Sequence, residues 1–571
     1  MEIAFGILIS VVQLAVFIGL IVFVVKLVTK RGASSAEGSG VSIRRFFQYS
    51  IMLVMLTVVA FGVIGLVDAI ASADTQLTRD TSAIARSIAF VVVGLPVYAG
   101  LVVYTRRRLT ADPVEARAIG WIFYLTVALI GSLIAAMSFL VAFAGDLLGD
   151  GEVNRTVLIS SLVWGGVWAV HWWVAARSAD SDRMQVHLLL GSATGLVTLS
   201  LGAGAAMTAA LSELYDALLS VTSVDTGVEN LVRGIVLFGI GALVWAFYWI
   251  GHARSTARTP TWLTYVLLVG VLGGVVTAVV GAAAVLFGTL DWIIGDVDAA
   301  TATAHFDFMP GAVVALAVGT SLWAYHRSVL GDRRGRPRTE IDRVYDYLLA
   351  GAGLLVAAGG LATLISVALE ALGSPDIATS GGSPSAVAIT LLVIGVPLWW
   401  RHWSTIRRFR AANPQEEVRS VTRRAYLFLL FGAAGIVAVI DLLILVFLIV
   451  EDLLEGTLSA ATVNAVAIPV SLLITAGAVS WYHFAVFRDD RSITPQVKAP
   501  VVREIIVVGS DEVGAAITSG TGARVVQFRA VDQSTEVATI DDVLGLLDIE
   551  THERIVVVAE DGGFRVLPIA N

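Results

Sequence analysis

Thirteen apolar segments, each of about twenty residues or more, run through this chain and are separated by short polar clusters. A helix needs roughly 20 residues to cross a hydrocarbon core about 30 Å thick. Backbone polar groups in lipid must bond within their own segment, so each run is expected to be a helix. The segments lie near 4–25, 47–72, 87–105, 118–146, 157–176, 186–215, 231–252, 262–293, 308–327, 345–371, 386–404, 425–452 and 462–486. The sequence therefore predicts an all-α polytopic membrane protein with about thirteen transmembrane helices.

The composition excludes a water-soluble enzyme. Hydrophobic residues make up 57% of the 571 residues and charged residues 15%, whereas soluble globular chains carry about 25% charged residues. The chain has no cysteine, which excludes disulfides, thiolate metal sites, iron–sulfur clusters and cysteine nucleophiles.

The first segment, 4–25, is expected to be an uncleaved membrane anchor that occupies residues 1–30. It opens with Met1 and Glu2 instead of a basic region, and its apolar run continues to Lys26. A secretory signal peptide would begin with positive charge and be shorter.

Lysine and arginine lie almost entirely on one side of the predicted spans. The loops on that side hold 26 of them, against four in the opposite loops and their borders. Positively charged loops stay in the cytoplasm, so we expect the N-terminus outside and the C-terminus inside. The outer loops are acidic, and carboxylates there could bind divalent cations. They match no ligand-loop motif, so a solvated outer face is the favoured interpretation.

Spans two to thirteen form six hairpins of one design in a predicted bundle at 44–488. Each hairpin has a long helix with an aromatic-rich cytoplasmic start, an acidic outer loop and a returning helix that ends in aromatic and basic residues. The hairpins lie near 44–108, 118–177, 186–254, 262–328, 345–408 and 425–488. The long helices of the third and fourth hairpins are rich in glycine. They are expected to line the bundle interior, because small residues let helices approach closely in lipid.

The returning helices carry a recurring Trp-x-x-His spacing. Trp168 precedes His171, Trp323 precedes His326 and Trp399 precedes His402 at this spacing. The third hairpin shifts the motif to Trp249 and His252, and in the sixth His483 follows Trp481 one place early. Aromatic residues recur at positions 98, 168, 245, 323, 399 and 481. This period indicates internal duplication.

Two interpretations of His171, His326 and His402 stay open. Histidine is a common metal ligand, and pairs among the three could hold a haem with nearby arginines on the propionates. The simpler interpretation places each cluster where a helix leaves the membrane, as an aromatic belt or as a donor and acceptor of hydrogen bonds between helices. This interpretation is favoured, so no cofactor or metal is expected.

Asp441 is the one carboxylate well inside a span, about 22 Å along the helix from Tyr426. An acid inside the membrane is costly and is by default a functional hypothesis, such as an ion or proton site. A structural role is the alternative, because the other hairpins have no equivalent acid.

The C-terminal region 500–571 is expected to be a small cytoplasmic α/β domain. It holds 12 acidic and 5 basic residues. Runs rich in β-branched residues predict strands near 504–508, 523–528 and 554–558, and a turn at 561–563 precedes a last strand at 564–569. Short helices are expected near 511–518 and 540–547. The turn after the first strand lacks the glycines and lysine of a phosphate loop, and no catalytic or nucleic-acid-binding motif is present.

The hairpin pattern resembles a bacterial multi-pass membrane family of unknown function built from tandem two-helix hairpins. The resemblance rests on Gly-x-Pro-x-aromatic elements at Gly94 to Tyr98 and Gly395 to Trp399, on the start at Arg44 and Arg45, and on the terminal Trp-x-x-His clusters. It covers roughly residues 44–488. It implies a helical bacterial membrane protein and supplies no activity, substrate or catalytic residue.

The sequence thus favours a non-enzymatic membrane scaffold or complex subunit in the inner membrane, whose acidic tail docks a cytoplasmic or membrane protein. A transporter or channel that uses Asp441 is the first alternative, and a haem-binding membrane protein is the second. A polar cavity that reaches Asp441 would favour transport, whereas a bundle packed by glycine and alanine would favour a scaffold.

Overall fold

The computed structural model describes residues 39–71, 81–112, 115–148, 153–178, 181–219, 227–331 apart from 296 and 298, 338–373 and 382–493. In the C-terminal region it describes 504–508, 514, 517–518, 524–528, 547, 554–560 and 563–569. The predicted first span at 4–25 lies outside the described residues.

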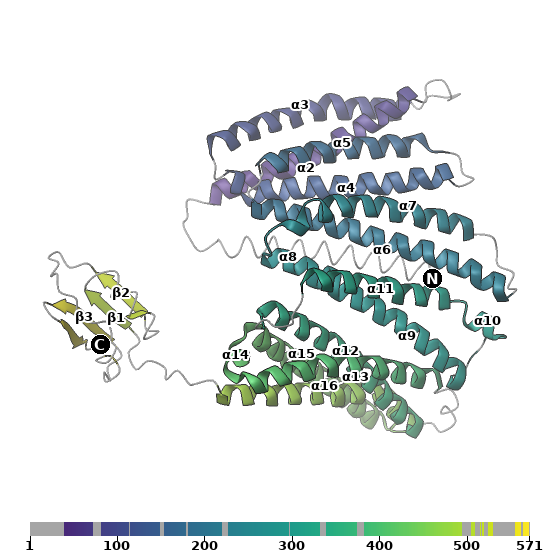
Figure 1. Cartoon of the computed structure of the whole chain (residues 1–571), viewed down its shortest axis with the longest axis vertical. Helices are drawn as coiled ribbons and strands as arrows, with labels where there is room; N and C mark the ends of the chain where they lie inside the picture. The colour runs from purple at the N-terminus through teal and green to yellow at the C-terminus, as the bar shows by residue number, and fades with distance from the viewer. Residues whose placement is uncertain are drawn as a thin grey trace. The chain divides into compact units, whose positions relative to one another are not determined.

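Twelve segments among the described residues are helical, long enough and apolar enough to cross a membrane. They coincide with predicted spans two to thirteen. The helices are α2 (Ser39–Ala71), α3 (Thr81–Ala111), α4 (Ile119–Leu148), α5 (Arg155–Ser178), α6 (Ser181–Leu219), α7 (Gly227–Trp245), α8 (Pro260–Thr264), α9 (Gly273–Ile294), α10 (Ala302–His305), α11 (Met309–Val329), α12 (Glu340–Gly373), α13 (Gly382–Ala412), α14 (Pro414–Arg419), α15 (Val421–Glu455) and α16 (Ala460–Ile493) (Figure 1). Short 3₁₀ turns are η2 (Glu115–Arg117) and η4 (Ala253–Ser255), and π-helical turns are η3 (Ala246–Ile250) and η5 (Tyr265–Leu272).

The helices pack in the predicted hairpins. Helix α2 packs against α3, α4 against α5, α6 against α7, and α9 against α11. Gly353 of α12 approaches the backbone of Trp399 in α13, and the Ser480 hydroxyl of α16 donates to the Phe431 carbonyl of α15 at 2.9 Å. Neighbouring hairpins also meet, because α4 packs against α7, α6 against α11 and α12 against α15.

Glycines set how closely the two helices of a hairpin approach. A Cβ atom on Gly241 of α7 would collide with the backbone nitrogen of Leu199 in α6. Gly319 and Gly395 are the equivalent glycines of the fourth and fifth hairpins, four residues before the recurring tryptophan. A Cβ atom on either would collide with the backbone nitrogen of the paired helix, at Ala278 and at Ala357 respectively. Helices in lipid associate mainly through such close van der Waals packing. The glycine-rich first helices of the third and fourth hairpins make the same kind of contact, since a Cβ atom on Gly202 of α6 or Gly281 of α9 would collide with the backbone of the returning helix.

The chain divides into two compact units. One contains residues up to Phe409 together with Val421–His483, and the other contains Arg410–Ser420 and the chain from Phe484. In the second unit Arg410 pairs with Asp489 and with Asp490, where its Nε donates to Asp490 Oδ1 at 2.9 Å.

The second unit also contains a four-stranded sheet in the order β2-β1-β3-β4. Its strands are β1 (Glu504–Val508), β2 (Arg524–Phe528), β3 (Arg554–Glu560) and β4 (Gly563–Pro568). Strand β1 is parallel to β2 and β3, and β3 forms an antiparallel hairpin with β4. The four predicted strands are confirmed. The two predicted helices lie mostly outside the described residues, although residues 514, 517, 518 and 547 are helical.

Replacing Gly241 by alanine should destabilise the membrane unit by about 1–3 kcal/mol, because the added methyl group would push α7 away from α6. The measurement is the free energy of unfolding of the purified protein in detergent. Gly239 of the same helix is the matched control, since a Cβ atom there meets nothing within 4 Å. An equal loss of stability in both variants would contradict close packing at Gly241.

Candidate functional site

A tyrosine and a histidine lie in ring contact within four of the six hairpins. The tyrosine comes from the first helix or its π turn, and the histidine comes from the returning helix. The ring centroids are 5.6 Å apart for Tyr124 and His171, 5.8 Å for Tyr265 and His326, 5.7 Å for Tyr345 and His402, and 5.8 Å for Tyr426 and His483. His171, His326 and His402, the histidines singled out in the sequence, thus each contact a tyrosine ring of their own hairpin.

Most of these histidines are fixed by their own helix. The Nδ1 atoms of His171, His326 and His483 lie 2.8, 2.9 and 2.8 Å from the carbonyl oxygen four residues earlier. A carbonyl can only accept, so Nδ1 carries the proton and Nε2 of the neutral ring is an acceptor. The three imidazoles therefore present an acceptor toward the inside of their hairpins.

Among the described residues, Nε2 has a hydrogen-bond partner in the second hairpin but not in the fourth or sixth. His171 Nε2 lies 2.9 Å from the Tyr124 hydroxyl, which lies 3.0 Å from the Tyr98 hydroxyl. Because His171 accepts, Tyr124 must donate to it and Tyr98 must donate to Tyr124. In contrast, the Nε2 atoms of His326 and His483 are buried and make no hydrogen bond with any residue that the structure describes. A buried polar atom without a partner is unusual and needs an explanation.

His402 is bound differently. Its Nδ1 lies 3.2 Å from Asp346 Oδ1, and the Arg338 guanidinium donates to the other oxygen of that carboxylate at 2.9 Å. All three side chains are largely buried. A buried charge is stable only when it is paired, so this network joins the first turns of α12 to the second half of α13.

A π turn lies where the third hairpin shifts the Trp-x-x-His motif to Trp249 and His252. The turn η3 carries an extra residue per turn, which moves His252 to an exposed position where its Nδ1 lies 2.8 Å from the Phe247 carbonyl. Tyr248 is fully buried, and its ring packs where a side chain on Gly191 of α6 would lie. The sequence showed the shift, but a π turn has no reliable sequence signature.

Indole N–H groups join neighbouring hairpins. Trp168 donates to Tyr248 at 2.7 Å, and Trp249 donates to Tyr325 at 2.8 Å. Three further bonds of this kind are Trp245 to Tyr265 at 3.1 Å, Trp323 to Tyr345 at 3.1 Å and Trp403 to Tyr482 at 2.8 Å. These bonds are of the interhelical kind that the sequence favoured for the clusters. Trp173, Trp400 and Trp481 are exposed, and their place in an aromatic belt stays a prediction.

Glu115 joins the start of α2 to the loop before α4. Its carboxylate accepts from Arg45 at 2.8 Å, from Arg44 at 3.1 Å and from the Tyr49 hydroxyl at 3.1 Å. Burial alone would raise the pKa of Glu115, but the hydrogen bond and charge of Arg45 and the charge of Arg44 outweigh it, so the pKa is lowered. Arg44 and Arg45 stand out in the sequence but their partner Glu115 does not, because the pairing spans about 70 residues.

Asp441 is one of three buried residues of α15, at 6% exposure. It makes no hydrogen bond or ion pair with any residue that the structure describes. Asp441 is not among the residues that line the cavity described next.

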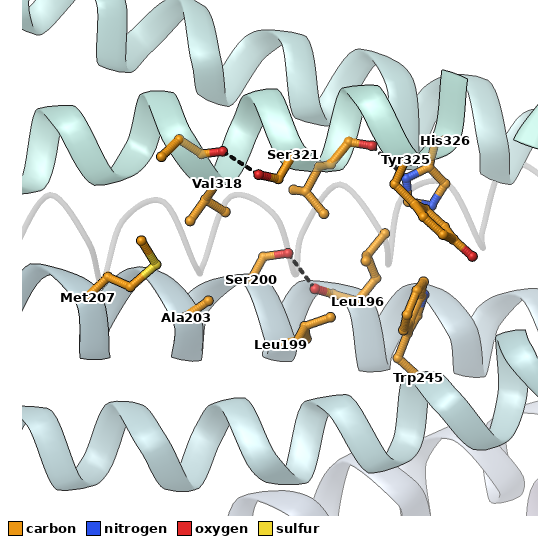
Figure 2. A pocket seen from close by; sticks show the side chains of 12 residues that line it. Leu196, Leu199, Ser200, Ala203, Met207, Trp245, Val318, Ser321, Tyr325 and His326 are labelled. Atoms are coloured by element: carbon orange, nitrogen blue, oxygen red, sulfur yellow. Dashed lines mark hydrogen bonds between the residues drawn. The ribbon is translucent and has the colours of Figure 1, made fainter. Parts of the chain in front are cut away.

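A cavity of about 290 Å³ lies between α6 and α11 (Figure 2). Leucine, alanine, valine and methionine form most of its wall, and Trp245, Tyr325 and His326 lie at one end. No predicted site residue other than His326 lines it. The third and fourth hairpins therefore enclose a mainly apolar site with one histidine.

The three predicted histidines do not contact one another. A haem with two histidine ligands needs two free imidazole nitrogens that face each other, but His171 Nε2 is bound to Tyr124 and His402 Nδ1 lies against Asp346. Within the described residues no group of three or more histidine, aspartate or glutamate side chains could hold a metal ion. The haem interpretation stays a prediction, without support from this geometry.

Comparison with protein families gives one match, to a domain of unknown function (DUF5671), at residues 45–163 and again at 343–478. The first segment covers α2 to α4 and the start of α5, and the second covers most of α12 to α16. No curated protein and no solved structure matches the chain. The chain is thus similar, over two segments, to a family without an assigned function.

Replacing Glu115 by glutamine should lower the free energy of unfolding at pH 7 by about 1–3 kcal/mol, because Arg44 and Arg45 would lose a charged acceptor. The folded-state pKa is lowered, so this stabilisation is present above the unfolded pKa and is lost as the pH falls through the folded pKa. The difference between the two proteins should therefore shrink below about pH 4.5.

The measurement is thermal unfolding of both proteins between pH 7 and pH 3. Asp112→Asn is the control, since this more exposed carboxylate lies 4.0 Å from Arg45 and such pairs contribute about 0–1 kcal/mol. A difference between wild type and Glu115→Gln that does not change with pH would contradict the assignment.

Proposed function

We propose that the chain is a non-enzymatic membrane scaffold or complex subunit. The observation that carries this proposal is the way the hairpins are held: glycines bring backbones into contact within hairpins, and indole–phenol hydrogen bonds join one hairpin to the next. Such packing favours a fixed platform over helices that move past one another. The cavity between α6 and α11 is mainly apolar and does not include Asp441, which also favours a scaffold over a transport path.

The proposal includes six tandem hairpins that arose by duplication in a bacterial inner-membrane protein, with the N-terminus outside. Support comes from the recurring tyrosine–histidine contacts and from the two family matches, each of which covers about two hairpins. The segment between the matches, 164–342, contains both π turns and the cavity. The π turns and the cavity thus lie in the middle hairpins, outside the two family matches, and we expect any specialised role of this chain there.

We place the partner at the cytoplasmic sheet. The region 500–571 carries 12 acidic and 5 basic residues, which favours a partner with a basic surface. Strand β2 is an edge of the described sheet, and Phe528 at its end is 56% exposed. An edge strand with an exposed aromatic residue is a template for docking.

Affinity purification from native membranes in mild detergent should yield a stoichiometric protein partner with the wild-type chain. Phe528→Asp should reduce partner recovery at least ten-fold, because the substitution adds a charge to the docking edge. Leu567→Asp on β4 is the matched control and should retain the partner. A chain that purifies alone under these conditions would contradict the docking proposal, and an absorption spectrum of the same sample tests for haem.

The second candidate function is ion or proton transport, and the buried Asp441 in α15 is the observation that favours it. Under the scaffold proposal, proteoliposomes with the wild-type chain and with Asp441→Asn should show the same ion and proton flux as empty liposomes. A flux with the wild type that Asp441→Asn abolishes would overturn the scaffold proposal in favour of transport.

A further inference from the structure

Tyr265 and Tyr345 hold equivalent places in the fourth and fifth hairpins. Each lies near the start of the first helix of its hairpin. Each accepts an indole N–H at 3.1 Å from the returning helix of the preceding hairpin, from Trp245 and from Trp323 respectively. Each ring also contacts the histidine of its own hairpin. The two tyrosines therefore fix the start of the two helices in the same way.

A glycine fixes each of these helices at a second point further along the chain. A Cβ atom on Gly274 would collide with the backbone nitrogen of Trp323, and a Cβ atom on Gly353 would collide with that of Trp399. The spacing between the two fixed points differs by one residue, because Gly274 comes nine positions after its tyrosine and Gly353 comes eight positions after its own. One residue turns an α-helix by about 100°. A regular α-helix therefore cannot satisfy both points in both hairpins.

The π turn η5 accommodates the additional residue of the fourth hairpin. It occupies Tyr265–Leu272, between the two fixed points, and the Gly273 N–H donates to the Leu268 carbonyl five residues earlier. The equivalent part of α12 is regular α-helix. Most π turns are single-turn bulges inside α-helices, and they occur frequently at functional sites. The π form of η5 thus depends on both fixed points being occupied.

The hydrogen bond between Trp245 and Tyr265 joins both π turns that the structure describes. Trp245 directly precedes η3, and Tyr265 is the first residue of η5. The bond between Trp323 and Tyr345 has the same length, but the helices that carry these two residues are regular. The junction between the third and fourth hairpins therefore differs from the next junction in its helix geometry and not in its hydrogen bond.

We propose that η5 is a two-state joint between the third and fourth hairpins. In the closed state, which the structure shows, the turn is π-helical and Tyr265 is bonded to Trp245. In the open state the segment is α-helical up to Gly274, which rotates Tyr265 by about 100° about the helix axis and breaks the bond. A partner that binds one state better shifts the joint toward that state. This joint goes beyond the proposed scaffold role and does not depend on it.

The test places fluorotyrosine in the position of Tyr265 in the full chain, in phosphatidylcholine nanodiscs, and records fluorine NMR spectra. Two states should give two resonances, or one broadened resonance whose relaxation dispersion reveals them, since helix register shifts take microseconds to milliseconds. The same label in the position of Tyr345 is the control and should give one sharp resonance. One sharp resonance at Tyr265 without relaxation dispersion would overturn the proposal.

Removing one residue tests the register directly. Leu268 is 47% exposed, and its deletion gives the fourth hairpin the spacing of the fifth. This variant should keep the melting temperature of the wild type and show one sharp resonance at Tyr265. Leu348 also follows its tyrosine by three residues, but its deletion should lower the melting temperature strongly because α12 has no additional residue to lose. Equal losses of stability in the two deletion variants, or two states that persist without Leu268, would contradict the joint.

A third comparison tests the hydrogen bond that holds the closed state. Trp245→Phe should raise the ratio of open to closed state about three-fold, as expected for the loss of one hydrogen bond between membrane helices. Trp323→Phe is the matched control, because it removes the same kind of bond at the next junction and should leave the ratio at Tyr265 unchanged. No shift with Trp245→Phe, or an equal shift with both variants, would count against the proposal. The spectrum of the labelled wild-type sequence alone decides whether two states exist, so misfolding of a variant leaves a decisive result.

Discussion

Helices in a bilayer gain little from the hydrophobic effect when they associate, because lipid chains are as apolar as leucine side chains. Contact must come from close packing and from polar groups that find partners. In this chain the close packing is supplied by glycines such as Gly241 and Gly319, which stand against the backbone of the paired helix. The tryptophan four places after each of them then has its backbone fixed within the hairpin, so its indole is free to reach the next hairpin.

This arrangement explains why aromatic and histidine side chains gather at one end of the helices. Trp168, Trp249 and Trp403 each donate to a tyrosine of another returning helix. His171, His326 and His483 donate to their own helix through Nδ1, which leaves Nε2 as an acceptor. Where a tyrosine donates to that nitrogen, as Tyr124 does to His171, both nitrogens of the imidazole have hydrogen-bond partners. His326 Nε2, in contrast, is buried and has no hydrogen-bond partner among the residues that the structure describes.

The sequence predicted all twelve spans found among the described residues, because the hydropathy of a twenty-residue segment depends on its composition alone. The four strands of the tail were likewise predictable from β-branched runs and a glycine turn. The pairing of Tyr265 with His326 was not predictable, since the two residues lie on different helices about 60 positions apart and their contact depends on how those helices pack. The ion pairs of Glu115 and Asp346 with arginine could not be predicted from the sequence, because they depend on the fold or on the conformation of a loop. The cavity has no sequence signature, because it is space left between side chains.

The central claim is that indole–phenol hydrogen bonds join neighbouring hairpins into one unit. A double-mutant cycle on Trp249 and Tyr325, which lie in different hairpins and are 2.8 Å apart at the bonding atoms, tests it most directly. Trp249→Phe, Tyr325→Phe and the double variant would be compared with the wild type in their free energies of unfolding. The account predicts a coupling energy of about 0.6 kcal/mol, as expected for a hydrogen bond between membrane helices. Additive effects, with no coupling between the two substitutions, would contradict it.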